Sequence, residues 1–465
     1  MARAGRPAPP GRLAPQGRLA LAIDVGTGTQ DVLLFDADRE IENAVRLILP
    51  SPTVILAERI RAATRARRPV LLGGGLMGGG PVAWAARDHA LAGLPIAAVP
   101  DAARTLDDDL DQVRALGIAI LPPDAVVGGA AGHSAGQAAA HSAGQAAGHS
   151  AAPGAVTIDL RDVWLPELAR TLSLYDVDVA AVDAVAVAVF DHGAAPPGVS
   201  DRRFRFERLR ERLATEPGQG PIAFSYLAAE VPAAFTRLAA AAGAVRSWLD
   251  AAGRTGVPVL AMDTGPAAVL GALDDDRVRH ELGRGRGVVA VNIGNFHTLA
   301  MRLQPGRLQP GVGDGLGGAA GARISRSGVR ISGSGVRITG IFEHHTGELT
   351  TPQLSRFLRQ LANGSLRDAD VFDSQGHGAL VLPVHGAGAA GSGHARAGEP
   401  GQARPFLTLT GPRRDLLAGH VVRGLGRPYL AVPHGDMMQA GPFGLLRALA
   451  WRVPGWREPI TRRLG

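Results

Sequence analysis

Short apolar runs separated by polar and glycine-rich breaks organise the first hundred residues. Runs of this length, rich in Val, Ile and Leu, are typical of strands, and a longer stretch between them indicates a helix. Three strands, a helix, a strand and a second helix follow one another, which predicts a mixed sheet rather than a purely parallel one. We expect the strands at residues 19–25, 30–35, 43–49 and 69–72, and the helices at 53–67 and from Pro81 onward.

The first break in this pattern combines a strand-end aspartate, Asp24, with a glycine-rich turn. Glycines at positions 26 and 28 let the main chain approach an anion, and successive N–H groups in such a turn form a concave anion site. Asp24 is placed to hold a metal ion that bridges phosphates. An ordinary β-hairpin is the alternative, and the segment alone does not decide. Additional side-chain donors come from Thr27, Thr29 and Gln30.

Two residue types are missing from the whole chain. It contains no Cys, and all 49 basic residues are arginine. Without cysteine there is no disulfide, thiolate nucleophile, cysteine-ligated zinc or iron–sulfur cluster. Without lysine there is no Schiff-base chemistry and no phosphate loop of the Walker type.

The excess of basic residues is small and evenly spread. Forty-nine arginines face 42 acidic residues, giving a net charge of +7, with local density at residues 202–212 and in the N-terminal tail. No RNA-binding signature and no alternation of basic and aromatic residues accompanies them. We therefore do not expect a nucleic-acid partner.

The sequence predicts neither a membrane segment nor a secretory signal. The most apolar run, residues 177–190, is too short to cross a bilayer and contains two aspartates. Residues 1–18 are rich in Arg, Pro and Ala, lack a continuous apolar stretch, and are expected to be a disordered tail. We expect a cytoplasmic protein without a membrane partner.

Glycine-rich and repetitive segments interrupt the pattern. No acidic residue ends a strand after the run at residues 73–80 in the way a dinucleotide fingerprint requires; we interpret the run as a loop lining a cleft, with that fingerprint as the alternative. A histidine-containing repeat at 133–148 has no apolar face to bury, so we expect disorder. The repeat of 327–332 at 334–339 predicts a surface hairpin, and 386–404 a linker.

The second half repeats the arrangement of the first. Residues 287–301 again form strand, glycine turn and strand, with Asn292 at the strand end. Small-residue helices, which allow close approach to another helix, are expected at 263–273 and 436–446. A strand, tight turn and helix are expected at 406–416.

This order of motifs resembles the superfamily that unites acetate and sugar kinases, heat-shock chaperones and actin. Residues 24–30 and 292–298 resemble its two phosphate turns, and 410–414 its adenosine motif; the two small-residue helices resemble its connecting segments. The resemblance implies an α/β fold with two ribonuclease-H-like (actin-like ATPase) domains, mixed five-stranded sheets, and ATP with Mg²⁺ in the interdomain cleft. The domains would be 19–285, with an insert at 131–153, and 286–465, with inserts near 322–340 and 386–404.

The resemblance also implies a set of site residues. Asp24 would organise Mg²⁺ and serve catalysis. The second turn usually carries an aspartate where this chain has Asn292, and an amide brings no charge to a metal ion. His297 in that turn either contacts phosphate or fills the loop. Nucleotide contacts would come from Gly26, Thr27, Gly28, Thr29, Gln30, Gly294, Asn295, Thr298, Gly411 and Arg413.

More narrowly, the chain resembles an uncharacterised family sometimes labelled as pyruvate formate-lyase activating enzyme. The similarity lies in residues 22–31, 342–346, 409–414 and 435–438. That label implies radical chemistry on a cysteine-held iron–sulfur cluster. Because the chain has no cysteine, the label does not describe its mechanism.

Further candidate residues lie at strand ends. Asp191 and His192 follow an apolar run, where a buried strand delivers catalytic groups, and as a pair they would form a general base; a turn or cap is the alternative. Histidines near Glu343 and at 373–378 would add metal ligands in combination, although their spacing is not that of a zinc helix.

Three functions remain open at this point. The first is an ATP-binding phosphotransferase or ATPase with an unknown acceptor. The second is a nucleotide-dependent regulator of a partner protein with little turnover, and the third is a metal-dependent hydrolase that uses the histidines. The expected partners are a nucleotide and an unidentified small molecule or protein.

Overall fold

The first of three sheets has six strands in the order β3-β2-β1-β8-β10-β9. The computed structural model describes residues 18–123, 154–216, 218–306, 335–382 and 404–465. Within the sheet, β1 pairs antiparallel with β2 and parallel with β8, and β8 pairs parallel with β10. Its strands are β1 (Leu19–Val25), β2 (Thr29–Asp36), β3 (Val45–Pro50), β8 (Ala184–Val189), β9 (Ser225–Leu227) and β10 (Val259–Asp263).

The second sheet has the order β14-β13-β12-β11-β15-β16 and repeats the core of the first. Its first strand, β11, again pairs antiparallel with the next strand and parallel with a later one, β15. The end of β11 therefore corresponds to the end of β1. Its strands are β11 (Val288–Ile293), β12 (His297–Pro305), β13 (Val336–His345), β14 (Gly376–Val381), β15 (Phe406–Thr410) and β16 (Tyr429–Leu430).

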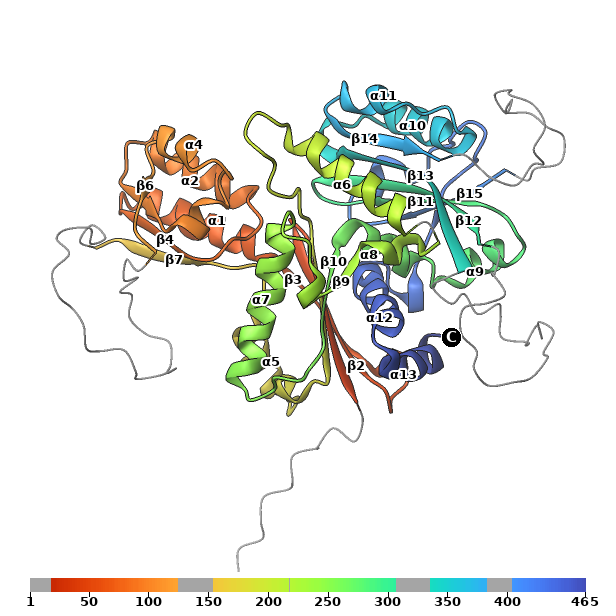
Figure 1. Ribbon diagram of the computed structural model, residues 1–465, viewed down its shortest axis with the longest axis horizontal. Coiled ribbons are helices and arrows are strands. Elements are labelled where there is room, and N and C mark those ends of the chain that lie inside the picture. The colour runs from red at the N-terminus through yellow and green to blue at the C-terminus, as the bar shows by residue number, and fades with distance from the viewer. Residues whose placement is uncertain (1–17, 124–153, 217, 307–334, 383–403) are drawn as a thin grey trace, which may run out of the picture.

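A third, four-stranded parallel sheet lies between β3 and β8 in the chain and projects to one side (Figure 1). Its order is β6-β5-β4-β7, and its apolar core includes Leu56 and Ile60 of the covering helix α1. Its elements are α1 (Pro52–Arg65), β4 (Val70–Gly74), α2 (Pro81–Leu91), β5 (Ile96–Ala98), α3 (Pro100–Ala103), α4 (Leu110–Ala115), β6 (Ala119–Ile120) and β7 (Val156–Leu160).

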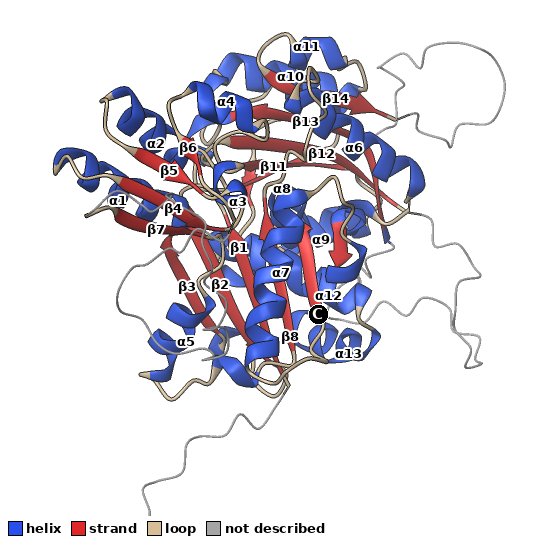
Figure 2. Ribbon diagram, turned by 60° about the vertical axis from the view of Figure 1, so that its left-hand side comes forward, coloured by secondary structure: helices blue, strands red, loops and turns tan. Residues whose placement is uncertain are grey.

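The strands alternate small and larger apolar residues, and this alternation sets the layers. In β8, the alanines at 184, 186 and 188 belong to the core between the two six-stranded sheets, whereas the valines at 185, 187 and 189 face the outer helices. Figure 2 shows α7 lying across the first sheet. The remaining helices are α5 (Leu165–Ser173), α6 (Asp201–Thr215), α7 (Thr236–Ala251), α8 (Thr264–Ala272), α9 (Asp276–Gly283), α10 (Thr351–Asn363), α11 (Asp368–Phe372), α12 (Ala440–Arg452) and α13 (Pro454–Leu464).

Helices α8 and α12 fill the space between the two sheets and pack unusually closely. A Cβ atom at Gly271 would collide with the carbonyl oxygen of Ala440, and one at Gly444 with that of Ala267. Only glycine allows the two backbones to approach this far. The expectation that these small-residue helices allow close approach to another helix is confirmed, and the structure shows that they approach each other.

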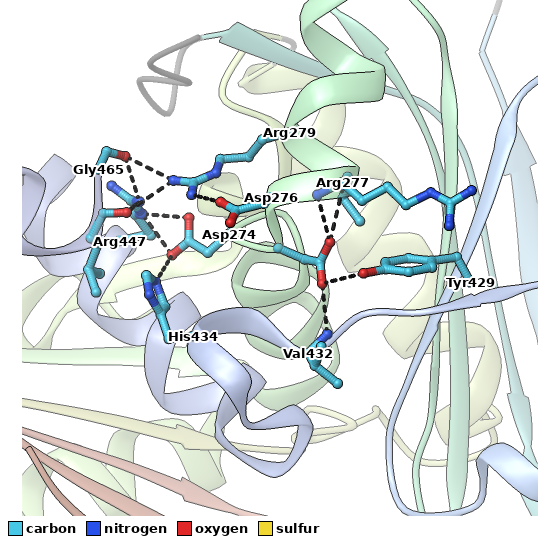
Figure 3. A network of polar contacts seen from close by, with 12 residues as sticks. Asp274, Asp276, Arg277, Arg279, Tyr429, Val432, His434, Arg447 and Gly465 are labelled. Carbon is cyan, nitrogen blue, oxygen red and sulfur yellow. Dashed lines mark hydrogen bonds and ion pairs between the residues drawn. The ribbon is translucent and has the colours of Figure 1, made fainter. Parts of the chain in front are cut away.

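Acidic residues after α8 tie this helix pair to the end of the second sheet (Figure 3). Arg447 of α12 donates from Nε to both carboxylate oxygens of Asp274, at 2.8 and 2.9 Å. Asp275 accepts hydrogen bonds from the Tyr429 hydroxyl and the Val432 N–H. This network fixes the position of α12 relative to α8.

The expected mixed α/β architecture is confirmed, with three differences. The two large sheets have six strands rather than five. The strand expected at 69–72 is β4, which belongs to the separate third sheet. There it pairs in parallel with β5 and β7. The repeat half at 336–339 belongs to β13, largely buried within the second sheet rather than on a surface hairpin.

Other expectations fall wholly or partly outside the described residues. These are the tail, the histidine repeat, the first half of the 327–339 repeat and the linker at 386–404. Among the described residues, no helix combines the length and apolar character needed to span a membrane.

Candidate functional site

Two tight turns, one from each six-stranded sheet, meet in the middle of the molecule. In the first, the Gly26 N–H donates to the Thr29 carbonyl at 2.9 Å; in the second, the Gly294 N–H donates to the His297 carbonyl at 2.9 Å. A Cβ atom at Gly28 would collide with the side-chain amide of Asn295. The two turns therefore have the same hydrogen bonding and touch one another.

A cavity of about 90 Å³ lies beside these turns, with room for several water molecules. It is lined from both sheets and by the first residues of α8 and α12, and helix N-termini carry a partial positive charge. Of the residues predicted from the sequence, those that line it are Asp24, Gly26, Thr27, Thr29, Gly294, Asn295 and Gly411.

Asp24 and Asp31 form a pair of buried carboxylates in this wall. They are direct partners in the register of β1 and β2, and each is less than a tenth exposed. The Thr264 hydroxyl donates to Asp24 Oδ1 at 2.6 Å, whereas Asp31 Oδ1 has no hydrogen-bond partner among the described residues. Burial raises the pKa of Asp24 to about 7, and burial together with the Asp24 charge raises the pKa of Asp31 to about 8. Adjacent carboxylates with an unpartnered oxygen form a donor set that suits a divalent cation.

A buried arginine joins the two sheets behind the cavity. Arg205 of α6 donates to Asp263 Oδ2 at 2.6 Å and to both oxygens of Glu343 at 2.5 and 2.8 Å. Its side chain is fully buried, and it also donates to the Asp191 carbonyl. Because Asp263 ends β10 and Glu343 lies in β13, Arg205 connects the two sheets through buried ion pairs.

A cluster of histidines lies next to Arg205. The Phe190 ring stacks on His297 with ring centroids 3.7 Å apart, and His192 and His377 bring their Nε2 atoms to 3.2 Å. Burial, followed by the nearby Arg205 charge, lowers the pKa of His192 to about 3. Burial also lowers the pKa values of His297 and His377, so these imidazoles are neutral at pH 7.

Asp191 follows β8, as expected, but its carboxylate is already engaged. Oδ1 accepts from the Gly193 N–H at 2.7 Å and Oδ2 from the Leu238 N–H at 2.8 Å. The residue is buried and is not among those lining the cavity. In this conformation it fixes the loop after β8 against the first turn of α7, which is the capping alternative. Its role as a base stays a prediction.

Four predicted nucleotide contacts lie outside the cavity wall: Gly28, which instead contacts Asn295, and three residues with other partners. Gln30 is buried in β2, and the Thr298 hydroxyl shares a hydrogen bond with the Thr346 hydroxyl at 3.0 Å. The Arg413 side chain is 50% exposed and lies 4.0 Å from Asp415. These residues stabilise the neighbouring elements rather than the cavity surface in this conformation.

The turn at Gly411 brings β15 against the second of the two tight turns, at residues 294–297. Gly411 has a φ of +103°, and a Cβ there would collide with the Ile293 carbonyl. The Arg413 N–H donates to that same carbonyl at 3.0 Å. Asn292, which ends β11 at the position corresponding to Asp24, lines the cavity beside it.

The third sheet supports the first turn from outside. The Ser51 hydroxyl donates to the Thr27 carbonyl at 3.0 Å, and the Ser51 N–H donates to the Gly28 carbonyl at 3.1 Å. The glycine run ends at Gly80, whose Cβ position would lie 3.4 Å from the Thr27 methyl group. The run therefore passes beside the turn, outside the residues that line the cavity.

A protein-family model matches residues 77–310 and 328–416 of the chain. Its description reads "putative pyruvate formate-lyase activating enzyme" (DUF1786). The chain belongs to this family. No curated protein and no solved structure matches it. Because the chain contains no cysteine, a cysteine-held iron–sulfur cluster cannot form on it, and the family description does not supply a mechanism.

Several residues of this site were missed from the sequence. Asp31 was predictable in part, because a turn closed between positions 26 and 29 places it opposite Asp24. Arg205 carried no signal beyond its place in an arginine-rich segment. Glu343 and His377 were noticed only as separate local motifs, since nothing in the sequence shows that β13 and β14 are neighbours.

Proposed function

We propose that this protein is an ATP-binding member of the actin-like superfamily, with two ribonuclease-H-like domains, that transfers or hydrolyses the γ-phosphoryl group with Mg²⁺. The observation that carries the proposal is the meeting of two equivalent turns, from two sheets of the same core strand order, at one cavity. Backbone N–H groups of both turns and the N-termini of α8 and α12 would bind phosphate oxygens.

The carboxylate pair supplies the expected place for Mg²⁺. Asp24 and Asp31 would hold the ion, which neutralises phosphate charge when bound. Asp31 Oδ1 is buried and has no hydrogen-bond partner among the described residues, so a cation would satisfy an otherwise costly acceptor. Thr264 would keep Asp24 in position through its 2.6 Å hydrogen bond.

Nucleotide binding requires the two turns to separate. The Asn295 side chain lies directly against Gly28 and joins the two turns beside the cavity. Opening of the sheets about α8 and α12 would admit the nucleotide, and closure would exclude water and align an acceptor.

A thermal-shift experiment on the full chain tests the proposal. ATP with Mg²⁺ should raise the melting temperature, because a ligand that binds only the folded state stabilises it, and ATP without Mg²⁺ should raise it less. The Asp31→Asn variant should lose the Mg²⁺-dependent part of this rise in melting temperature. The Asp38→Asn variant, changed at an exposed position, should keep it. The absence of any shift with Mg²⁺ and a panel of nucleotides would contradict nucleotide binding.

A second function, a nucleotide-dependent regulator with little turnover, is favoured by Asn292. This residue stands where the second sheet would present a charge to the metal, and its amide offers none. Measuring ATP binding and hydrolysis on the same preparation separates the two functions. Tight ATP binding with negligible release of phosphate supports the regulator. Phosphate release that decreases in the Asp24→Asn variant supports the enzyme.

A further inference from the structure

Four histidines gather from strands that are distant in the sequence. His297 begins β12, His345 ends β13 directly opposite it, and His377 lies in the neighbouring strand β14. His192 reaches the same place from the end of β8 in the other sheet. Two sheets therefore contribute imidazoles to one point.

Three of these imidazoles have the spacing of metal ligands. One ring nitrogen from each of His192, His297 and His377 lies within 4.8 Å of the other two. The Nε2 atoms of His192 and His377 are 3.2 Å apart. Two nitrogens bound tetrahedrally to one Zn²⁺ at about 2.0–2.1 Å are separated by about 3.3 Å, so this pair already has ligand geometry. A ring nitrogen of His297 lies within the same 4.8 Å limit and is the third potential ligand.

Two ring nitrogens in the cluster are without partners. His297 Nε2 and His377 Nδ1 are buried and make no hydrogen bond to any described residue. Unpaired buried polar atoms are costly, and a metal ion would satisfy the first of them directly. The second faces Glu343 Oε2 at 3.9 Å, so that His377 would bind metal through Nε2 and direct its Nδ1–H toward a carboxylate. Metal-binding histidines commonly have such an outer carboxylate.

We propose that His192, His297 and His377 bind one divalent transition-metal ion, with Zn²⁺ as the best-suited ion, and leave its fourth position open. Three imidazoles without a carboxylate ligand select zinc-like ions over Mg²⁺ and Ca²⁺. Glu343 orients His377 and is itself held by Arg205. This site is separate from the Asp24 and Asp31 pair and does not depend on nucleotide binding.

His297 connects the new site with the cavity. It belongs to the second turn and lines the cavity, whereas His192 and His377 lie behind it. An ion with an open coordination position there would face the space beside the turn. A ligand with an anionic oxygen bound beside the turn is the chemistry that such an ion would attract.

The test is metal binding by the full chain without a polyhistidine tag. Protein stripped with a chelator is titrated with Zn²⁺ by calorimetry, in excess Mg²⁺, and its metal content is measured after dialysis. We expect one Zn²⁺ per chain, with affinity about 100-fold lower in His297→Gln and in His377→Gln. The matched control is His344→Gln, because both ring nitrogens of that buried neighbour are already hydrogen bonded, to the His345 carbonyl and the Ser374 hydroxyl.

Each outcome decides the proposal. Stoichiometric binding that is lost in the cluster variants, with circular dichroism unchanged, supports it. No stoichiometric Zn²⁺, or binding that persists in a His192→Gln/His377→Gln double variant, overturns it. If a single variant fails to fold, absorption of Co²⁺ bound to the unmodified protein reports whether the site is tetrahedral, and an octahedral spectrum overturns the proposal. Neither result changes the expectation for ATP binding, because the shifts in melting temperature with Mg²⁺ and nucleotide are measured without Zn²⁺.

Discussion

The Thr264 hydroxyl donates a 2.6 Å hydrogen bond to Asp24 Oδ1, joining the first residue of α8 to the end of β1. The same carboxylate faces Asp31 across the β1–β2 pair. The first sheet thus presents two buried acids at the cavity, and Asp31 Oδ1 has no hydrogen-bond partner among the described residues. This electrostatically unfavourable pair lies beside the two turns and the N-termini of α8 and α12.

Asp31→Asn should stabilise the metal-free protein at high pH. The folded pKa of Asp31 is raised to about 8, so its ionisation lowers stability progressively as pH rises toward that value. A shift of one pKa unit corresponds to about 1.4 kcal/mol. At pH 9 the free energy of unfolding of the variant should therefore exceed that of the unmodified protein by at least this amount. Thermal unfolding at pH 4, pH 6 and pH 9 measures this difference, which should be small at pH 4, near the ordinary pKa of an aspartate, and already larger at pH 6.

Added Mg²⁺ should reverse the difference in stability between the unmodified protein and Asp31→Asn. It should stabilise the unmodified protein more at pH 9 than at pH 6, because protons compete for the same carboxylates, and it should have little effect on Asp31→Asn. An equal Mg²⁺ effect in both proteins would show that Asp31 is not part of a cation site.

Arg205→Gln should destabilise the fold by about 3–5 kcal/mol. The substitution leaves Asp263 and Glu343 buried without their partner, and removing one member of a buried ion pair has this cost. Arg210→Gln, on the exposed face of the same helix, is the matched control and should change stability by less than about 0.5 kcal/mol. Denaturant unfolding measures the loss of stability in both variants. Similar losses would show that Arg205 does not link the two sheets.

The individual strands, turns and helices of the site could be predicted from the sequence more fully than the contacts between them. Strand β1 and the glycine turn after Asp24 follow from local pattern, because the strand is a short, mostly apolar run that is buried throughout and only glycine suits the crowded turn. The small residues of α8 and α12 indicated close approach to another helix, but not which helix each would contact. The cluster at Arg205 was not, since ion pairs between positions 205 and 343 depend on the packing of two sheets.

The third sheet shows a second limit of local pattern. Residues 70–74 form a strand, as expected, but the sequence does not state which strands neighbour it. Its partners β5 and β7 lie on either side of it, and β7 follows a long insertion in the chain. A mixed single sheet and two separate sheets therefore produce the same order of elements in the sequence.

Gly444→Ala should destabilise the protein by about 1–3 kcal/mol or more, because the added methyl group meets the Ala267 carbonyl. In Gly243→Ala, on α7, the new methyl group meets no atom within 4 Å, and removing a helical glycine should stabilise by about 0.5–1 kcal/mol. The two substitutions are chemically identical, so opposite signs in denaturant unfolding isolate the helix contact. The same sign in both would contradict close packing of α8 against α12.

Asp274→Asn should cost about 3 kcal/mol at neutral pH, because Arg447 loses the carboxylate that accepts two of its hydrogen bonds (Figure 3). Burial alone would raise the pKa of Asp274, but the Arg447 charge and its hydrogen bonds, together with the nearby His434, outweigh it, and the pKa is lowered. A lowered folded pKa contributes stability that is complete above the ordinary value of about 4 and is lost as pH falls through the folded value. The difference between the unmodified protein and the variant should therefore be constant from pH 5 to pH 8 and shrink below about pH 4. Asp276→Asn is the control: its side chain is 94% exposed, and its pairing with Arg279 should contribute less than about 1 kcal/mol at any pH.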